Sequence, residues 1–82
     1  MPKLRRLNGK QVMKILEGFS FEVVRIRGSH HQLQRIINGR RQNLTVPIHG
    51  SEPLTIGTLR SIYREACTYI PEEDIASLFF GD

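Results

Sequence analysis

Apolar positions near the start of the chain recur with the period of an α-helix. They follow one another at intervals of three and four residues, which places them on one side of a helix. These positions are Val12, Ile15, Leu16 and Phe19. Asn8 is a favourable N-cap, and Gln11 three residues later completes a variant of the capping box. The pattern predicts a first helix that begins after Asn8 and ends near Gly18, because glycine favours helix ends.

The next part of the chain contains three strand-like runs, at about residues 21–27, 30–37 and 40–46, separated by two turn dipeptides. Gly28-Ser29 fits a two-residue type II′ turn, in which glycine supplies the positive φ of the first central residue. Asn38-Gly39 is the strongest short-range hairpin signal and fits a type I′ turn. Pro47 lacks a backbone N–H and is expected to end the third run. The runs therefore predict a three-stranded antiparallel meander.

The two turns also predict the strand register, and the register assigns each side chain to one face of the sheet. The first turn pairs Arg27 with His30, Ile26 with His31 and, further back, Val24 with Leu33. The second turn sets Ile37 opposite Arg40, and the pairs counted back from there assign the side chains to the same two faces. The predicted core face carries Val24, Ile26, His31 and Leu33. The predicted open face carries Arg25, Arg27, His30, Gln32 and Gln34. We therefore expect His30 to be exposed and His31 to pack at the rim of the core.

Two further helices are expected after the strands. One begins near Thr55, and its apolar positions again recur with helical period. Its inner face would consist of Leu59, Ile62, Tyr63, Ala66 and Ile70. Pro71 and the acidic residues after it fit the first turn of a third helix, whose apolar side would be Ile75, Leu78 and Phe79. The order α-β-β-β-α predicts an α+β fold with both main helices on one face of the sheet, as in a double-stranded-RNA-binding domain.

Basic residues are concentrated in the first half of the chain and acidic residues toward its end. The net charge is +4, from 12 Lys and Arg and 8 Asp and Glu. Such an asymmetry predicts a surface that faces a polyanion, and an acidic tail. Cys67 is the only cysteine, which excludes an internal disulfide, and we expect it to be a buried small hydrophobic residue. No apolar run approaches the roughly 20 residues of a membrane span, so we expect a soluble cytoplasmic protein.

The adjacent histidines at the start of the second strand are the strongest candidates for chemistry, because histidine transfers protons near neutral pH. His30 would stand at the mouth of a rigid hairpin, opposite Arg27. The alternative is an ordinary surface pair, as most histidines on strands are. Ser29 is better explained as a turn residue than as a nucleophile, since no acid is placed to orient a serine–histidine pair. His30, His31 and His49 have no Asp or Cys nearby, so no metal site is predicted.

Four segments of the chain resemble the HicA toxin family, the mRNA interferases of HicA–HicB toxin–antitoxin pairs. They are Arg27-Gly28-Ser29-His30-His31, Asn38-Gly39-Arg40-Arg41, Thr45-Val46-Pro47-Ile48-His49 and Gly57-Thr58-Leu59-Arg60-Ser61-Ile62. The resemblance covers about residues 8–68 of a single domain, 1–82, and leaves 71–80 as a helical extension. It implies the double-stranded-RNA-binding fold, an mRNA substrate and a HicB-like antitoxin, in an assembly that can be of higher order. No cofactor is implied.

The resemblance also implies that one strand histidine is needed for RNA cleavage. The family's Gly-Ser-His element matches Gly28, Ser29 and His30, while some members carry the histidine one residue later, at the position of His31. The register argument favours His30 and leaves His31 as the alternative. The family's Val-Pro-x-His segment ends at His49, but Gly50 stands where a proline usually follows, which puts a role for His49 in doubt.

The chemistry that the family implies suits these residues. A histidine base would take the proton of a ribose 2′-hydroxyl, which then attacks the adjacent phosphorus and leaves a cyclic phosphate end. Arg27 would stabilise charge on the phosphoryl oxygens. The candidate RNA-binding residues are Arg25, Arg27, Gly28, Ser29, Gln32, Arg40 and Arg41. Two other functions remain open at this point: a non-catalytic double-stranded-RNA-binding module, and a protein-interaction domain whose basic surface meets an acidic partner.

Overall fold

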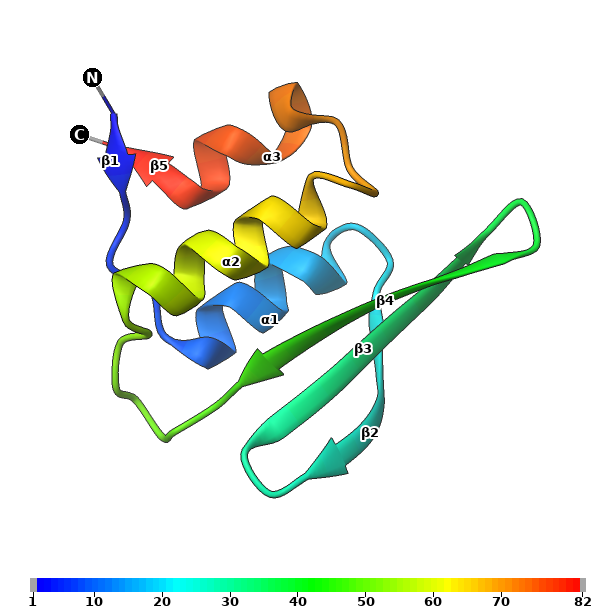
Figure 1. Cartoon of the computed structure of the whole chain (residues 1–82), viewed down its shortest axis with the longest axis horizontal. Coiled ribbons are helices and arrows are strands. Elements are labelled where there is room, and N and C mark those ends of the chain that lie inside the picture. The colour runs from blue at the N-terminus through cyan, green and yellow to red at the C-terminus, as the bar shows by residue number, and fades with distance from the viewer. Residues whose placement is uncertain (1, 82) are drawn as a thin grey trace.

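The computed structural model describes residues 2–81 and has the predicted α+β order, with one additional short strand at each end. A three-stranded antiparallel sheet, in the order β2-β3-β4, carries helices on one face (Figure 1). The elements are β1 (Lys3–Leu4), α1 (Gly9–Glu17), β2 (Glu22–Arg27), β3 (His30–Ile37), β4 (Arg40–Pro47), α2 (Ile56–Ala66), α3 (Glu72–Phe79) and β5 (Phe80–Gly81).

Both predicted hairpin turns are confirmed by their backbone angles. Gly28 has a φ of +60° and Ser29 has no positive φ, which is the pattern of a type II′ turn. Asn38 and Gly39 have φ of +52° and +77°, so both central residues are left-handed, as a type I′ turn requires. The pairing of β3 with β4 then follows the predicted register along its whole length, from His30 opposite Pro47 to Ile37 opposite Arg40.

One part of the predicted register is wrong. Val23, rather than Val24, pairs with Leu33, because a β-bulge between Val23 and Arg25 inserts an extra residue into β2. Val24 is therefore 52% exposed and does not belong to the core. Ile26 keeps its predicted partner, His31, but is 60% exposed because it lies on the edge strand near the turn, away from the buried core. The bulge leaves the register at the turn itself unchanged.

The first two helices begin where the sequence predicts. The Asn8 side chain accepts a hydrogen bond of 2.8 Å from the backbone N–H of Gln11, and the Gln11 side chain accepts one from Asn8, which completes the capping box. At the start of α2, the Thr55 side-chain oxygen accepts a hydrogen bond of 3.2 Å from the backbone N–H of Thr58. The two helices and the sheet enclose one core of buried apolar side chains. It includes Leu7, Val12, Leu16, Phe21, Leu33, Leu44, Val46, Leu59, Ile62, Tyr63 and Ala66.

The start of α1 packs closely against the chain that leaves β4. A Cβ atom on Gly9 would meet the carbonyl oxygen of Pro47 and would lie 2.8 Å from Cγ1 of Ile48. Only glycine permits this approach. The contact holds the end of β4, and hence the partner of His30, against the helical layer.

The C-terminal extension completes the core instead of projecting from it. In α3, Ile75 and Phe79 are buried, and the ring of Phe79 lies 5.3 Å from that of Tyr63. Burial, together with hydrogen bonds to Cys67 and Glu72, raises the pKa of Tyr63, so that its hydroxyl stays protonated and donates to Glu72 at 3.1 Å. The two ends of the chain meet as a two-stranded ribbon, with Leu4 opposite Phe80. Sequence patterning did not predict this ribbon.

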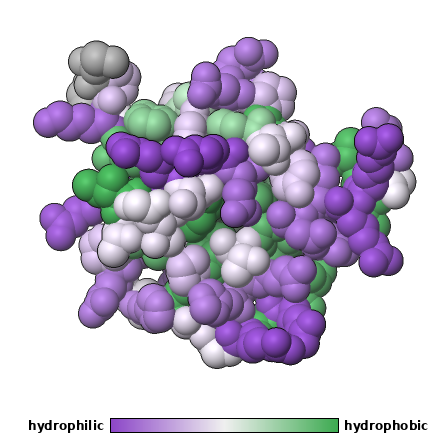
Figure 2. Space-filling view, in the orientation of Figure 1, coloured by the Kyte–Doolittle hydropathy of each residue, from purple (hydrophilic) through white to green (hydrophobic). Residues whose placement is uncertain are grey.

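The structure also bears on the expectations for Cys67, for the surface and for membrane spans. Cys67 is half-buried and packs against the core, so it is less enclosed than expected. Hydrophilic side chains cover most of the face shown in Figure 2, and apolar groups show between them. Within residues 2–81, no helix is long and apolar enough to cross a membrane.

Candidate functional site

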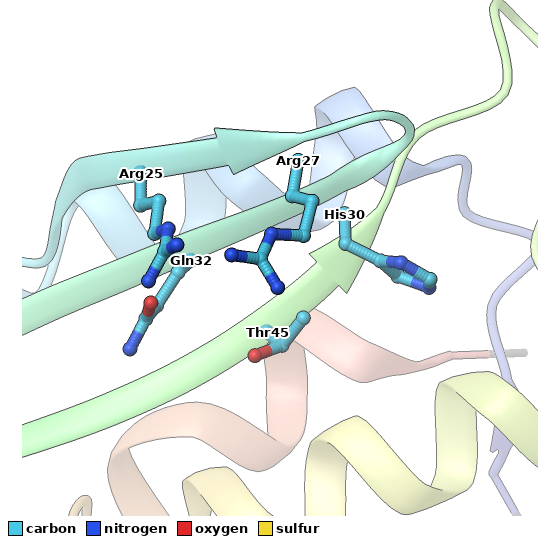
Figure 3. A pocket seen from close by; sticks show the side chains of 5 residues that line it. All are labelled: Arg25, Arg27, His30, Gln32 and Thr45. Atoms are coloured by element: carbon cyan, nitrogen blue, oxygen red, sulfur yellow. The ribbon is translucent and has the colours of Figure 1, made fainter.

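The open face of the sheet carries a shallow depression of about 170 Å³ next to the β2–β3 turn. Each strand contributes to it: β2 supplies two arginines, β3 a histidine and a glutamine, and β4 a threonine (Figure 3). The lining residues are Arg25, Arg27, His30, Gln32 and Thr45. Four of these five, all except Thr45, are candidate site residues from the sequence, and the structure brings those four together.

The register explains why these side chains meet. Arg27 pairs with His30, and Gln32 lies between Arg25 on one side and Thr45 on the other. Residues directly opposite one another in antiparallel strands project from the same face, with their Cβ atoms about 5 Å apart. The second turn sets the register that places Thr45 opposite Gln32, so the same sequence signal identifies Thr45 as a neighbour of the other four residues.

The depression suits an anion. Among residues 2–81, its lining has two guanidinium groups and no carboxylate. Within residues 2–81, none of the five side chains makes a side-chain hydrogen bond to another residue, so their donors remain free for a ligand. Arginine binds phosphate oxygens through two parallel N–H groups, which gives both strength and orientation.

The two candidate histidines lie on opposite faces of the sheet, because they are consecutive residues of one strand. His30 is exposed on the open face. His31 is half-buried on the helical face, and its Nδ1 lies 3.1 Å from the carbonyl oxygen of Ser29. A carbonyl only accepts, so Nδ1 of His31 is the donor in this hydrogen bond. The two imidazoles therefore cannot act together on one phosphate group.

The remaining predicted residues are spread along the sheet. Gly28 and Ser29 form the turn and set the position of His30 through their backbone. Arg40 and Arg41 lie at the opposite tip of the β3–β4 hairpin (Figure 1). They pair with Ile37 and Ile36, roughly 20 Å from His30 at about 3.3 Å per strand residue. They do not line the depression and would meet a more distant part of a long ligand.

His49 is separate from the depression. It is exposed in the loop that follows β4, where its carbonyl oxygen accepts a 3.2 Å hydrogen bond from the backbone N–H of Glu52. Gly50 beside it has a φ of +59°, a conformation that proline cannot adopt. The path of this loop therefore depends on Gly50, which stands where the family usually has a proline.

A second hollow begins where the first one ends. His30 and Thr45 also line a groove of about 400 Å³ between β4 and α2. Residues on α2 that face it include Gly57, Ser61 and Glu65. Sequence patterning did not indicate this groove, because it arises from the packing of α2 beside β4.

The donor groups needed for a metal site are not gathered anywhere in the part of the chain that the structure describes. No three His, Cys, Asp or Glu side chains from residues 2–81 come close enough to hold a metal ion together. His30 and His31 point to different faces, and His49 belongs to a separate loop.

Comparison with known proteins identifies the family of the chain. Residues 9–67, which include the sheet and both main helices, match the family model described as the HicA toxin of bacterial toxin–antitoxin systems. Toxins of this family are mRNA interferases and pair with HicB antitoxins. Neither a search of curated proteins nor one of solved structures gave a match. Since the match spans well over half of the sequence and both hairpins of the site, the chain belongs to the HicA toxin family.

Proposed function

We propose that this toxin is an endoribonuclease that cleaves mRNA on the open face of its sheet, with His30 as the proton-transfer group. The proposal rests mainly on one observation: the exposed imidazole of His30 lines the same depression as two guanidinium groups that make no side-chain hydrogen bond within residues 2–81. Arg25 and Arg27 would bind the phosphate whose ester bond is cut. His30 would then lie within reach of the ribose beside that phosphate.

The reaction can be written from these groups. His30 takes the proton of the 2′-hydroxyl, and the 2′ oxygen forms a bond to the neighbouring phosphorus. The bond from phosphorus to the 5′ oxygen of the next nucleotide breaks, and that oxygen takes a proton from solvent. The products are a 2′,3′-cyclic phosphate end and a 5′-hydroxyl end. Arg27, directly opposite His30, would stabilise the negative charge that grows on the phosphoryl oxygens.

His31 would have a different role. The hydrogen bond from its Nδ1 to the Ser29 carbonyl holds the turn, so His31 is proposed to position His30 and not to touch RNA. Gln32 and Thr45 offer further hydrogen-bonding groups to the ribose–phosphate chain. Arg40 and Arg41 are proposed to bind phosphates further along the same strand.

The reaction requires a 2′-hydroxyl at the cut, and this gives a direct experiment. An RNA oligomer should be cut to products with cyclic phosphate ends, and the same oligomer with one 2′-deoxynucleotide at the cut should stay intact. Binding without cleavage of either oligomer would favour a non-catalytic RNA-binding module. Neither binding nor cleavage would favour a protein-interaction domain.

The antitoxin is proposed to act on the same face. A HicB-like partner that presents carboxylates to Arg25 and Arg27 would neutralise the phosphate site and cover His30. Complementary charge would speed the encounter, and apolar burial around Pro47 and Ile48 would slow release.

A further inference from the structure

The groove between β4 and α2 differs in chemistry from the depression that holds the two arginines, although His30 and Thr45 line both. In the described part of the chain, residues 2–81, no lysine or arginine lines the groove. Hydroxyl groups come from Thr58 and Ser61, apolar surface from Pro47 and Ile62, and a carboxylate from Glu65. A phosphate group would be repelled by Glu65 and would gain no cation there. A neutral planar group that carries N–H donors suits this lining.

His30 lies where the two hollows join. Figure 3 shows its imidazole turned away from Arg25 and Arg27 and toward the end of β4. His30 pairs with Pro47, the last residue of that strand, and Pro47 lines the groove. An RNA strand whose phosphate rests on the arginines, with its ribose at His30, would therefore bring the next base to the mouth of the groove.

We propose that this groove binds the nucleobase beside the scissile phosphate and that Glu65 makes guanine the preferred base. The inference rests on the proposed function and adds a specificity-determining residue to it. The volume of about 400 Å³ lies in the range of small-molecule sites, about 300–1,000 Å³. A carboxylate only accepts hydrogen bonds, and it has two oxygens. Guanine presents two adjacent donor nitrogens, N1 and N2, on its Watson–Crick edge. Each of the other three bases has only one donor nitrogen on that edge.

Binding of uncleavable RNA tests the inference independently of catalysis. Short 2′-O-methyl oligonucleotides that differ at one base would be titrated against the wild-type protein and against Glu65→Gln. We expect the guanine oligomer to bind about tenfold more tightly than the others, and Glu65→Gln to remove most of that difference. Glu73→Gln, which changes an exposed carboxylate in the first turn of α3, is the matched control and should keep the preference.

Equal affinity for all four bases would overturn the proposal, and so would a guanine preference that survives Glu65→Gln. The proposed function is tested separately by cleavage of ordinary RNA. A protein that binds guanine oligomers through Glu65 but does not cut RNA would contradict the nuclease and leave the base groove supported.

Gly57 offers a steric test of the same groove. A Cβ atom placed on Gly57 would have no atom of residues 2–81 within 4 Å, so a large side chain there would extend into the groove without disturbing the core. Gly57→Phe should weaken oligonucleotide binding by about tenfold, the loss expected for one excluded base. Ile56→Phe adds a ring at a neighbouring position that does not line the groove and should bind normally. Normal binding by a folded Gly57→Phe variant would contradict the proposal.

Discussion

The backbone N–H of Ile48 donates a hydrogen bond of 2.8 Å to the carbonyl oxygen of Ser29. The same oxygen lies 3.1 Å from Nδ1 of His31. The turn that presents His30 is therefore held by the chain that leaves β4 and also by the neighbouring histidine. Two adjacent histidines thus have different surroundings, and their substitutions should have different consequences.

Replacing His30 by alanine should abolish RNA cleavage and growth inhibition without reducing stability. The side chain is exposed, so little packing is lost, whereas removal of a general base typically lowers the rate on the order of 100- to 10,000-fold. Cleavage rates and thermal unfolding would be measured on the same preparations. His49→Ala is the control and should cleave normally. A folded His30→Ala variant with full activity would refute the assignment.

His31→Ala should instead act through the turn. Loss of the hydrogen bond to the Ser29 carbonyl should lower the free energy of unfolding by about 1 kcal/mol. Cleavage should fall but remain well above that of His30→Ala, and denaturant titration together with single-turnover rates would separate the two effects. If His31→Ala loses all cleavage with unchanged stability while His30→Ala stays active, the catalytic group is His31.

Cleavage should not require a divalent metal ion, because in the proposed reaction His30 takes the proton and Arg27 stabilises the charge on the phosphoryl oxygens. The rate in excess EDTA should equal the rate in magnesium buffer at matched ionic strength. Loss of activity in EDTA, with recovery on addition of one particular metal, would contradict the proposed single-histidine reaction.

Reversal of charge on the open face should weaken both RNA and antitoxin binding. Arg25→Glu with Arg27→Glu would place carboxylates where phosphates or acidic side chains are proposed to dock. For RNA, each lost phosphate contact should also flatten the dependence of affinity on salt, by a slope of about 0.7 on logarithmic axes for single strands. Isothermal titration at several salt concentrations measures both partners. Unchanged affinity for the antitoxin would mean that inhibition acts at another surface.

Arg35 provides a prediction about stability alone. Its guanidinium donates to the carbonyl oxygens of Phe19 and Tyr69 at 2.9 and 3.0 Å, and it lies over the ring of Phe21. Arg35→Met keeps much of the apolar stem but removes these donors, so the free energy of unfolding should fall by about 2 to 4 kcal/mol. Arg40→Met, at the exposed hairpin tip, should change it by less than about 0.5 kcal/mol. Chemical denaturation of both variants would check the difference.

The sequence alone determined those features that depend on neighbouring residues. The positive φ values at Gly28, Asn38 and Gly39 are local requirements of two-residue turns, and they set which residues oppose each other. The position of His30 opposite Arg27 follows from the first turn. The alternation of strand side chains between the two faces of the sheet follows from the same local geometry. The capping box at Asn8 is equally local. These features fix the order of elements and the face on which each histidine lies.

Tertiary structure decided the rest. The bulge at Val24 and the exposure of Ile26 depend on where the edge strand leaves the core. The alternation of apolar and polar residues along one strand does not indicate that point. The ribbon of β1 with β5 joins residues almost a whole chain apart. The groove between β4 and α2 exists because α2 packs beside β4, which brings Glu65 and Pro47 to one hollow although no turn or periodicity relates them. Local rules act over a few residues, whereas these contacts form only when the whole core closes.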